Sequence, residues 1–145
     1  IIPTLLWHID QYQDQTQIQV AFQHTNLQGR RFNPELEITV YRIVQEGLTN
    51  IARHAGVDQA SVRIWCSETV LGVQIEDGGK GFILDDNLSA RQSRGLIGIR
   101  ERVGFLGGRL SIITSPGEGT TLNIEIPLQG KLERRSHARN HTAGG

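Results

Sequence analysis

The chain has 145 residues, 37% of them hydrophobic, and its formal net charge is zero at pH 7. A chain of this length has room for one domain with a sizeable core. No apolar run approaches the length of a membrane span, so we expect no membrane contact by this domain. Because the chain begins at Ile1 and contains no methionine and no secretory signal, we expect it to be a piece of a longer protein.

Charge is distributed unevenly along the chain. The segment 129–145 holds four basic residues against one acidic residue, which leaves residues 1–128 with a net charge of −3. A mildly acidic body argues against a nucleic-acid-binding surface. The segment 129–145 is poor in apolar residues, and we expect a disordered basic tail there.

Apolar patterns predict alternating helices and strands. The predicted helices lie near 3–14, 34–55 and 95–107, and the predicted strands near 17–24, 59–67, 70–77, 109–115 and 119–128. Pro34, directly after Asn33, marks the start of the longest helix. Cys66, the only cysteine, shares a strand face with Val62 and Ile64. We therefore expect a buried thiol, no internal disulfide, and a cytoplasmic location.

The longest predicted helix carries a polar stripe. Glu46, Asn50 and His54 are four residues apart, and the first two border the apolar face of the helix. An acid and a carboxamide at the edge of a cleft suit a hydrated divalent cation that carries phosphates. Taken alone, the stripe is more typical of an ordinary polar helix flank.

The predicted strand over 71–77 places Asp77 on its inward face, because the odd-numbered residues alternate toward the core. A buried carboxylate is costly unless donors meet it, so we expect either a protein group or a ligand amino group there. Gly78, Gly79 and Gly81 follow and allow a close approach to the backbone. An ordinary glycine turn is the alternative interpretation.

Two later blocks are also suggestive. Gly95 and Gly98 open an amphipathic pattern, and free amides at such a helix start bind anions. Thr120 lies on the inward face of the last predicted strand, where it is either an ordinary strand threonine or a hydroxyl that contacts a ligand.

In this order the blocks resemble the catalytic ATP-binding domain of sensor histidine kinases, within the short-lid subfamily that includes nitrate sensors and the membrane-fluidity sensor. The resemblance covers about residues 30–128. It implies a two-layer α/β (α+β) sandwich, the Bergerat ATP-binding fold, with a mixed, mainly antiparallel sheet and helices on one face. It also implies that 15–128 is the ATP-binding domain and that 1–14 ends a linker from dimerisation helices outside this chain.

The resemblance implies roles for the polar stripe. Asn50 would ligate Mg²⁺, and Glu46 would hold the water shell of the ion or assist proton removal. Arg53 and His54 would approach the phosphates of ATP. Arg53 departs from the lysine common in the subfamily, which keeps the charge but changes its shape.

The remaining site residues are implied in the same way. Asp77 would accept a hydrogen bond from the adenine amino group, and Thr120 would bond adenine directly or through water. Gly79 and Gly81 would let adenine and the lid approach. The backbone amides of Gly95, Leu96 and Gly98 would face the phosphates.

The resemblance further implies an ATP lid over 82–94. Two departures from the subfamily pattern lie near it. Gly78 replaces a frequent asparagine or aspartate, and Ser93 replaces a frequent glycine, which makes the flexibility of the lid less certain.

The implied function is transfer of the ATP γ-phosphate to a histidine in a dimerisation domain, for relay to a response regulator by a homodimeric parent. None of the five histidines has the setting of an acceptor, and His8 is expected to be exposed on a helix. The chain alone should therefore not autophosphorylate. A membrane anchor on the parent is left open.

Three alternatives remain. The first is an ATP-hydrolysing conformational module, the second is an anti-sigma-type serine kinase, and the third is a degenerate domain that binds a partner without ATP. Isolated ATPase activity would favour the first, and acid-stable phosphoserine the second.

Overall fold

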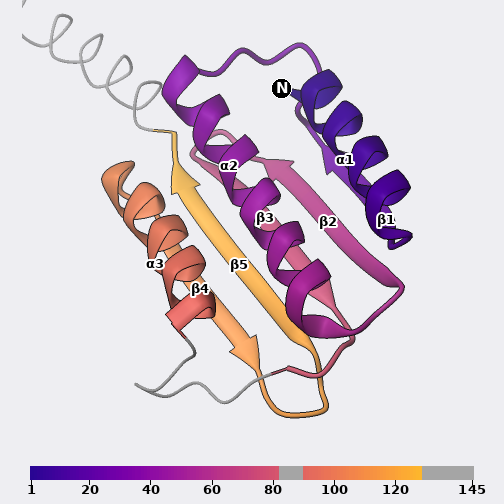
Figure 1. Ribbon diagram of the computed structural model, residues 1–145. Helices are drawn as coiled ribbons and strands as arrows, with labels where there is room; N and C mark the ends of the chain where they lie inside the picture. The colour runs from indigo at the N-terminus through magenta and orange to yellow at the C-terminus, as the bar shows by residue number, and fades with distance from the viewer. Residues whose placement is uncertain (82–89, 129–145) are drawn as a thin grey trace, which may run out of the picture.

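The computed structural model describes residues 1–81 and 90–128 (Figure 1). The predicted disordered tail and residues 82–89 of the predicted lid lie outside the described residues. The helices are α1 (Ile2–Thr16), α2 (Pro34–Asn50) and α3 (Ala90–Phe105), with a π-helical turn, η1 (Ile51–Ala55), directly after α2. The strands are β1 (Gln19–Thr25), β2 (Gln59–Cys66), β3 (Val70–Asp77), β4 (Arg109–Thr114) and β5 (Thr120–Pro127).

The strands form one mixed sheet in the order β1-β2-β3-β5-β4. β1 and β2 are parallel, and the other neighbouring strands are antiparallel. All three helices lie over the same face of the sheet (Figure 1). The two-layer sandwich predicted from the sequence is thus confirmed.

Local sequence explains where α2 begins. The Asn33 side chain accepts a hydrogen bond from the backbone N–H of Leu36 at 2.8 Å, and Pro34 occupies the first turn. Glu35 and Glu37 favour the positive end of the helix dipole. The helical path continues to residue 55 as predicted, but η1 replaces the last α-helical turn, and Gly56 ends it with a φ of 67°.

The N-terminal helix belongs to the same core as the sheet. Leu5, Ile9 and Tyr12 are buried in one cluster with residues of α2 and the strands. The side chain of Gln13 accepts a hydrogen bond from the backbone N–H of Val20 at 2.7 Å, which ties the end of α1 to β1. Whether this segment continues into dimerisation helices stays a prediction.

The two faces of the sheet differ. The face beneath the helices is apolar, as the alternation of buried residues along β2 and β3 predicts. On the other face Trp65 lies against its cross-strand partner Gly72, where any Cβ would collide with the indole ring. Cys66 is buried on the helix-covered face, so its predicted core position is confirmed.

One helix boundary was predicted wrongly. We expected a helix over 95–107, but α3 begins five residues earlier, at Ala90, and ends at Phe105. The predicted stop is confirmed, because Gly107 takes a φ of 76° and Gly108 donates to the carbonyl of Val103 at 2.8 Å. Among the described residues, no helix combines the length and apolar character that crossing a membrane requires.

Candidate functional site

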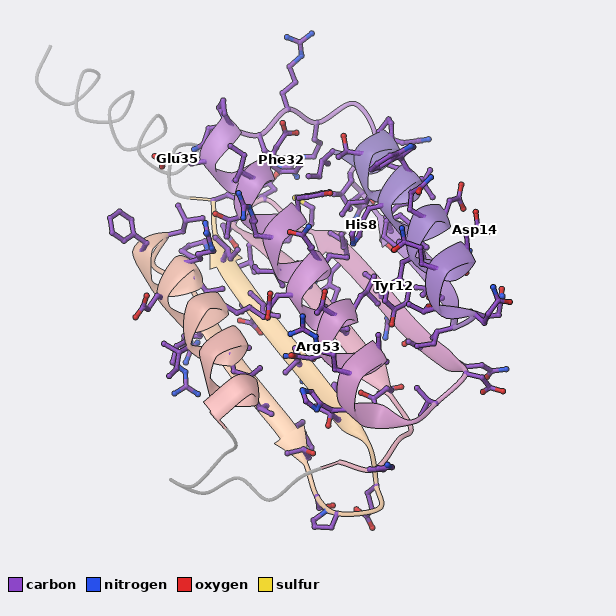
Figure 2. The ribbon with its side chains drawn as sticks, in the orientation of Figure 1. His8, Tyr12, Asp14, Phe32, Glu35 and Arg53 are labelled. Carbon is purple, nitrogen blue, oxygen red and sulfur yellow. The ribbon has the colours of Figure 1, made fainter. Side chains whose placement is uncertain are left out.

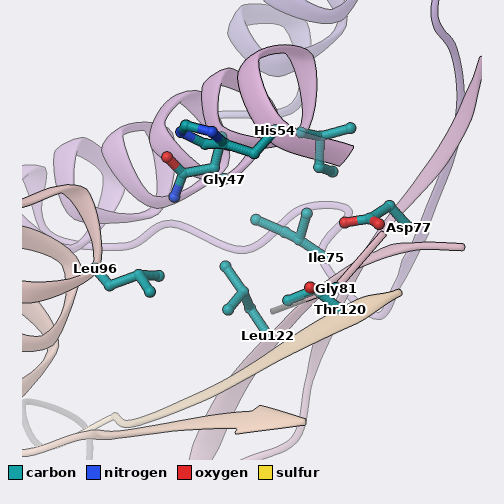
Figure 3. Close-up of a pocket in the computed structure, with 10 residues that line it drawn as sticks. Gly47, His54, Ile75, Asp77, Gly81, Leu96, Thr120 and Leu122 are labelled. Carbon is teal, nitrogen blue, oxygen red and sulfur yellow. The ribbon is translucent and has the colours of Figure 1, made fainter. Parts of the chain in front are cut away.

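A pocket lies where the end of α2 and η1 pass over β3 and β5 (Figure 3). It is partly open to solvent. The lining residues come from α2, η1, β3, the loop after β3, α3 and β5: Gly47, Asn50, Ile51, His54, Ile75, Asp77, Gly81, Leu96, Thr120 and Leu122.

Asp77 is the charged group on the sheet side of this pocket. It is 8% exposed, and its Oδ1 accepts a hydrogen bond from the backbone N–H of Gly79 at 2.8 Å. Burial raises the pKa of Asp77 and the nearby Glu76 charge raises it further, whereas hydrogen bonds from the Gly79 and Thr120 backbones act in the opposite direction. The protein itself thus meets part of the hydrogen-bonding capacity of this carboxylate.

Thr120 stands beside Asp77, its partner in the register between β3 and β5. Its Oγ1 lies 3.0 Å from the Oγ1 of Thr114. The Thr114 hydroxyl also donates a hydrogen bond to the carbonyl oxygen of Gly119 at 3.0 Å. Figure 3 shows Asp77 and Thr120 on the sheet side of the pocket, opposite His54. An acceptor and a hydroxyl therefore share one wall, as the sequence predicted for their strand faces.

The predicted polar stripe of α2 divides between two sides of the helix end. Asn50 and His54 line the pocket. Glu46 lies one turn earlier against Gly95, so closely that a Cβ on Gly95 would collide with the Glu46 carboxylate. Arg53 is exposed on η1 and lies outside the pocket lining. The turn itself is of a kind that is frequent at functional sites.

Glycines shape the loop after β3, which borders the pocket. Gly81 has a φ of 62°, and a Cβ there would collide with the carbonyl oxygen of Ser115. The backbone carbonyl of Lys80 accepts a hydrogen bond from the Gly117 N–H at 2.6 Å, which holds the loop after β3 against the β4–β5 turn. Gly79, through its amide, orients Asp77. The predicted close approach at Gly81 is thus to protein backbone in this structure.

The prediction for Gly95 and Gly98 needs correction. Both lie inside α3, six and nine positions into a helix that starts at Ala90, so their amides are in the hydrogen-bonded part of the helix. Only Leu96 of this block reaches the pocket. Gly95 and Gly98 instead border a neighbouring hollow of about 280 Å³ with Arg42, Gln45, Glu46, Ile99 and Arg102.

The side chains of the site suit a magnesium ion that is also bound by phosphates. They are less suited to a metal ion that is held by protein ligands alone. Among residues 1–81 and 90–128, no three histidine, cysteine, aspartate or glutamate side chains are placed to hold a metal ion. Mg²⁺ uses few protein ligands, keeps several waters and takes substrate phosphates as ligands. The carboxamide oxygen of Asn50, with the Glu46 carboxylate one turn away, matches that demand in chemistry.

Sequence reasoning missed part of the pocket. Gly47, Ile51, Ile75 and Leu122 line it, and none of them was among the predicted site residues. The one available signal was Gly47, a glycine on the apolar face of a long helix. A Cβ there would approach Ile75 Cδ1 to 2.6 Å, so glycine keeps the helix close to β3.

Comparison with known proteins identifies the family of this chain. Residues 35–130 match the family described as histidine kinase-, DNA gyrase B-, and HSP90-like ATPase. The chain is 41% identical over 128 residues to the signal transduction histidine-protein kinase/phosphatase DegS of Brevibacillus brevis, covering 88% of this chain and 32% of that protein. It is 34% identical over 105 residues to the oxygen sensor histidine kinase NreB of Staphylococcus carnosus, covering 72% of this chain and 30% of that protein.

Solved structures of histidine kinases resemble this chain. The blue-light activated histidine kinase EL346 of Erythrobacter litoralis superposes with a TM-score of 0.63 at 29% identity, covering 85% of this chain and 40% of that chain. The Acinetobacter baumannii histidine kinase AdeS, at 14% identity, covers 88% of this chain and 62% of that chain, and shares the fold with a TM-score of 0.67. The chain spans about a third of the curated relatives it matches. It belongs to the histidine kinase-, DNA gyrase B-, and HSP90-like ATPase family, which binds ATP.

Proposed function

We propose that this domain binds Mg-ATP and, in its full-length parent, transfers the γ-phosphate to a histidine of a dimerisation domain, from which a response regulator takes it. The supporting observation is the buried Asp77 carboxylate, which stands beside Thr120 and faces the helix end that carries Asn50 and His54. Family membership accounts for ATP, and a response regulator follows from the histidine kinase class. We propose that this phosphotransfer takes place in the cytoplasm, where ATP is supplied.

Asp77 would select adenine by accepting from its amino group, and Thr120 would add a second contact. A carboxylate that already accepts from two backbone amides has a fixed orientation, so it recognises a donor without reorganising. Asn50 would hold Mg²⁺, which when bound supplies positive charge against the phosphates. Arg53 and His54 would approach those phosphates from η1.

Binding of the ATP phosphates by backbone amides would require the start of α3 to change its conformation. With α3 continuous from Ala90, the amides of Gly95 and Gly98 are hydrogen-bonded within the helix. We propose that nucleotide binding unwinds the first turns of α3, which frees these amides and moves Leu96 away from Leu122. The place of Leu96 supports this step, because this residue of α3 lines the pocket together with Leu122 of β5.

In the transfer, a bond forms between the γ-phosphorus and the acceptor histidine nitrogen, and the bond to the β–γ bridging oxygen breaks to release ADP. Glu46 would take the imidazole proton or hold water on the ion. Most of the catalysis would be positioning and neutralisation of charge. Both acceptor helices and regulator lie outside this chain.

The test is reconstitution with separately produced dimerisation helices and γ-labelled ATP. Acid-labile label on those helices, absent with Asn50→Ala, is the expected result. Acid-stable label on a partner's serine would instead identify a serine kinase, and rapid ATP hydrolysis by the isolated domain would identify a conformational module.

A further inference from the structure

Two arginines border the hollow that contains Glu46, and the fold gives neither of them a partner. Arg42 of α2 and Arg102 of α3 line this hollow from neighbouring helices. Both side chains are exposed, and within residues 1–81 and 90–128 neither guanidinium forms a hydrogen bond or an ion pair. A single exposed arginine is an ordinary solvated side chain. Two arginines from different helices at one hollow supply the charge and the donors that bind an anion.

The hollow adjoins the pocket along α2. Arg42, Glu46 and Asn50 are four residues apart, so each lies about 6 Å from the next along one side of the helix. Asn50 lines the pocket, and Glu46 lines the hollow one turn earlier. The Glu46 carboxylate lies against Gly95, and the next residue of α3, Leu96, lines the pocket. A ligand that extends from the pocket past Asn50 therefore enters the hollow.

Arg53, which the proposed function already assigns to the phosphates, lies on the other side of Asn50. It belongs to η1, three residues after Asn50, whereas Arg42 lies two turns before Asn50. Figure 2 shows Arg53 toward the end of the path formed by α2 and η1, and Glu35 at its start. The two arginines are roughly 15 Å apart along this path. Arg42 is thus the cation on the Glu46 side of the site.

The proposed reaction requires the γ-phosphate to lie near Glu46. If Glu46 takes the imidazole proton, the acceptor nitrogen and the γ-phosphorus that it attacks lie within about one imidazole ring of the Glu46 carboxylate. The negative charges of a phosphate and a carboxylate repel each other, and the repulsion grows where water is excluded. The hollow carries two guanidinium groups against the one carboxylate of Glu46, and they offset this repulsion.

We propose that Arg42 and Arg102 bind the γ-phosphate of ATP from the two helices, beside Glu46. Guanidinium groups bind phosphate oxygens through paired, charge-assisted hydrogen bonds. Arg102 lies beyond Gly98, in the part of α3 that the proposed unwinding leaves helical. The two arginines would neutralise the charge of the γ-phosphoryl group and hold it for the acceptor nitrogen. This inference rests on the proposed function, and neither arginine is among the predicted site residues.

A comparison of ATP with ADP isolates the γ-phosphate. Arg42→Gln and Arg102→Gln should each weaken Mg-ATP binding about tenfold, the effect of one charge-assisted contact. Both variants should leave Mg-ADP binding within about twofold of wild type, because ADP has no γ-phosphate. Arg102→Lys keeps the charge without the planar fork, so it should retain part of the ATP affinity. Calorimetric titration gives the affinities, and thermal denaturation checks that each variant is folded.

Arg100→Gln is the matched control. Arg100 is an exposed arginine of α3, two residues from Arg102 and outside the lining of the hollow, so this variant should bind both nucleotides as wild type does. Equal losses of ATP and ADP affinity in Arg42→Gln and Arg102→Gln would overturn the inference alone. So would unchanged ATP affinity, including the case in which the arginines hold an acidic side chain of the acceptor helix. A wild-type domain that binds neither nucleotide would overturn both this inference and the proposed function.

Discussion

At the scale of single residues, the ionised Asp77 carboxylate lowers the stability of the fold, while it offers a hydrogen-bond acceptor to a ligand. Its carboxylate is buried, and burial raises its pKa above the ordinary value. A raised carboxyl pKa means that the folded state binds the proton more tightly than the unfolded state does. The ionised form therefore lowers the stability of the fold, and this cost grows as pH rises through the window between the two pKa values.

Asp77→Asn should accordingly have opposite effects on stability and binding. The variant should unfold at a higher temperature than the wild type at pH 7, because a buried charge is removed and the amide oxygen can still accept from Gly79. ATP binding should become too weak to detect, because the amide nitrogen of the substituted side chain donates hydrogen bonds and cannot accept one from the adenine amino group. Thermal denaturation between pH 4 and 8 should show the stability gap closing as pH falls. Lower stability of the variant at neutral pH would contradict this description of Asp77.

Gly47 is a second residue whose size matters. Ala at this position would place its Cβ 2.6 Å from Ile75 Cδ1, inside the pocket and between α2 and β3. We expect Gly47→Ala to lower the free energy of unfolding by about 1 to 3 kcal/mol, the usual range for overpacking. Gly104→Ala is the control, because nothing lies within 4 Å of a Cβ there and alanine favours a helix interior. Urea denaturation of both variants provides the measurement, and equal stability would contradict the close packing.

Sequence alone located most of these residues for a physical reason. Strand alternation is strict, so the inward positions of Asp77 and Thr120 followed directly from their neighbours. The pocket role of Ile75 and Leu122 did not follow, because an apolar residue has the same pattern whether it faces protein or ligand.

At the scale of elements, the start of α3 is where sequence and structure disagree most. Glycines are poor helix formers, so Gly95 and Gly98 suggested a helix start, but the helix extends through both. Preceding residues can add turns to a helix that tertiary contacts already hold, and Glu46 packs directly on Gly95. Local propensity cannot report such contacts.

If nucleotide binding unwinds the first turns of α3, helix propensity at Ser93 should control affinity. Ser93→Ala should weaken ATP binding and Ser93→Gly should strengthen it, with about a fivefold difference between the two, because alanine and glycine differ by about 1 kcal/mol in a helix. Gly104→Ala lies in turns that stay helical, so it should leave affinity unchanged. Calorimetric titration gives the affinities, and the reverse order of the two Ser93 variants would argue against unwinding.

The pair of Trp65 and Gly72 tests the opposite face of the sheet. Gly72→Ala should displace the indole, because a Cβ there collides with it, and should destabilise the fold by about 2 kcal/mol. The fluorescence of Trp65 should shift toward that of an exposed indole. ATP affinity should not change, since the pocket lies beneath the helices on the other face. A loss of binding in a folded Gly72→Ala domain would show that the two faces are coupled.

At the scale of the whole molecule, α1, α2, α3 and the sheet share one apolar core. The buried cluster includes residues from the first helix to the last strand, so we expect a single cooperative unfolding transition. The sequence resemblance began at about residue 30 and gave no reason to include α1. Its three buried residues show why the segment packs with the rest.

Adjacent leucines of α1 allow a clean test of that packing. Leu5 is fully buried and Leu6 is 47% exposed. Leu5→Ala should lower the free energy of unfolding by about 2 to 5 kcal/mol. Leu6→Ala should change it by no more than about 0.5 kcal/mol. Chemical denaturation followed by circular dichroism separates the two, and equal effects would show that α1 is not part of the cooperative unit.

The central claim is that the pocket of Asp77 and Asn50 binds Mg-ATP, and calorimetric titration tests it most directly. Wild-type domain should bind ATP more tightly with magnesium than without it. Asn50→Ala should lose the magnesium dependence, and Asp77→Asn should lose ATP binding while remaining folded. A folded wild-type domain that takes up no ATP, or an Asn50→Ala variant that keeps the full magnesium effect, would contradict the account.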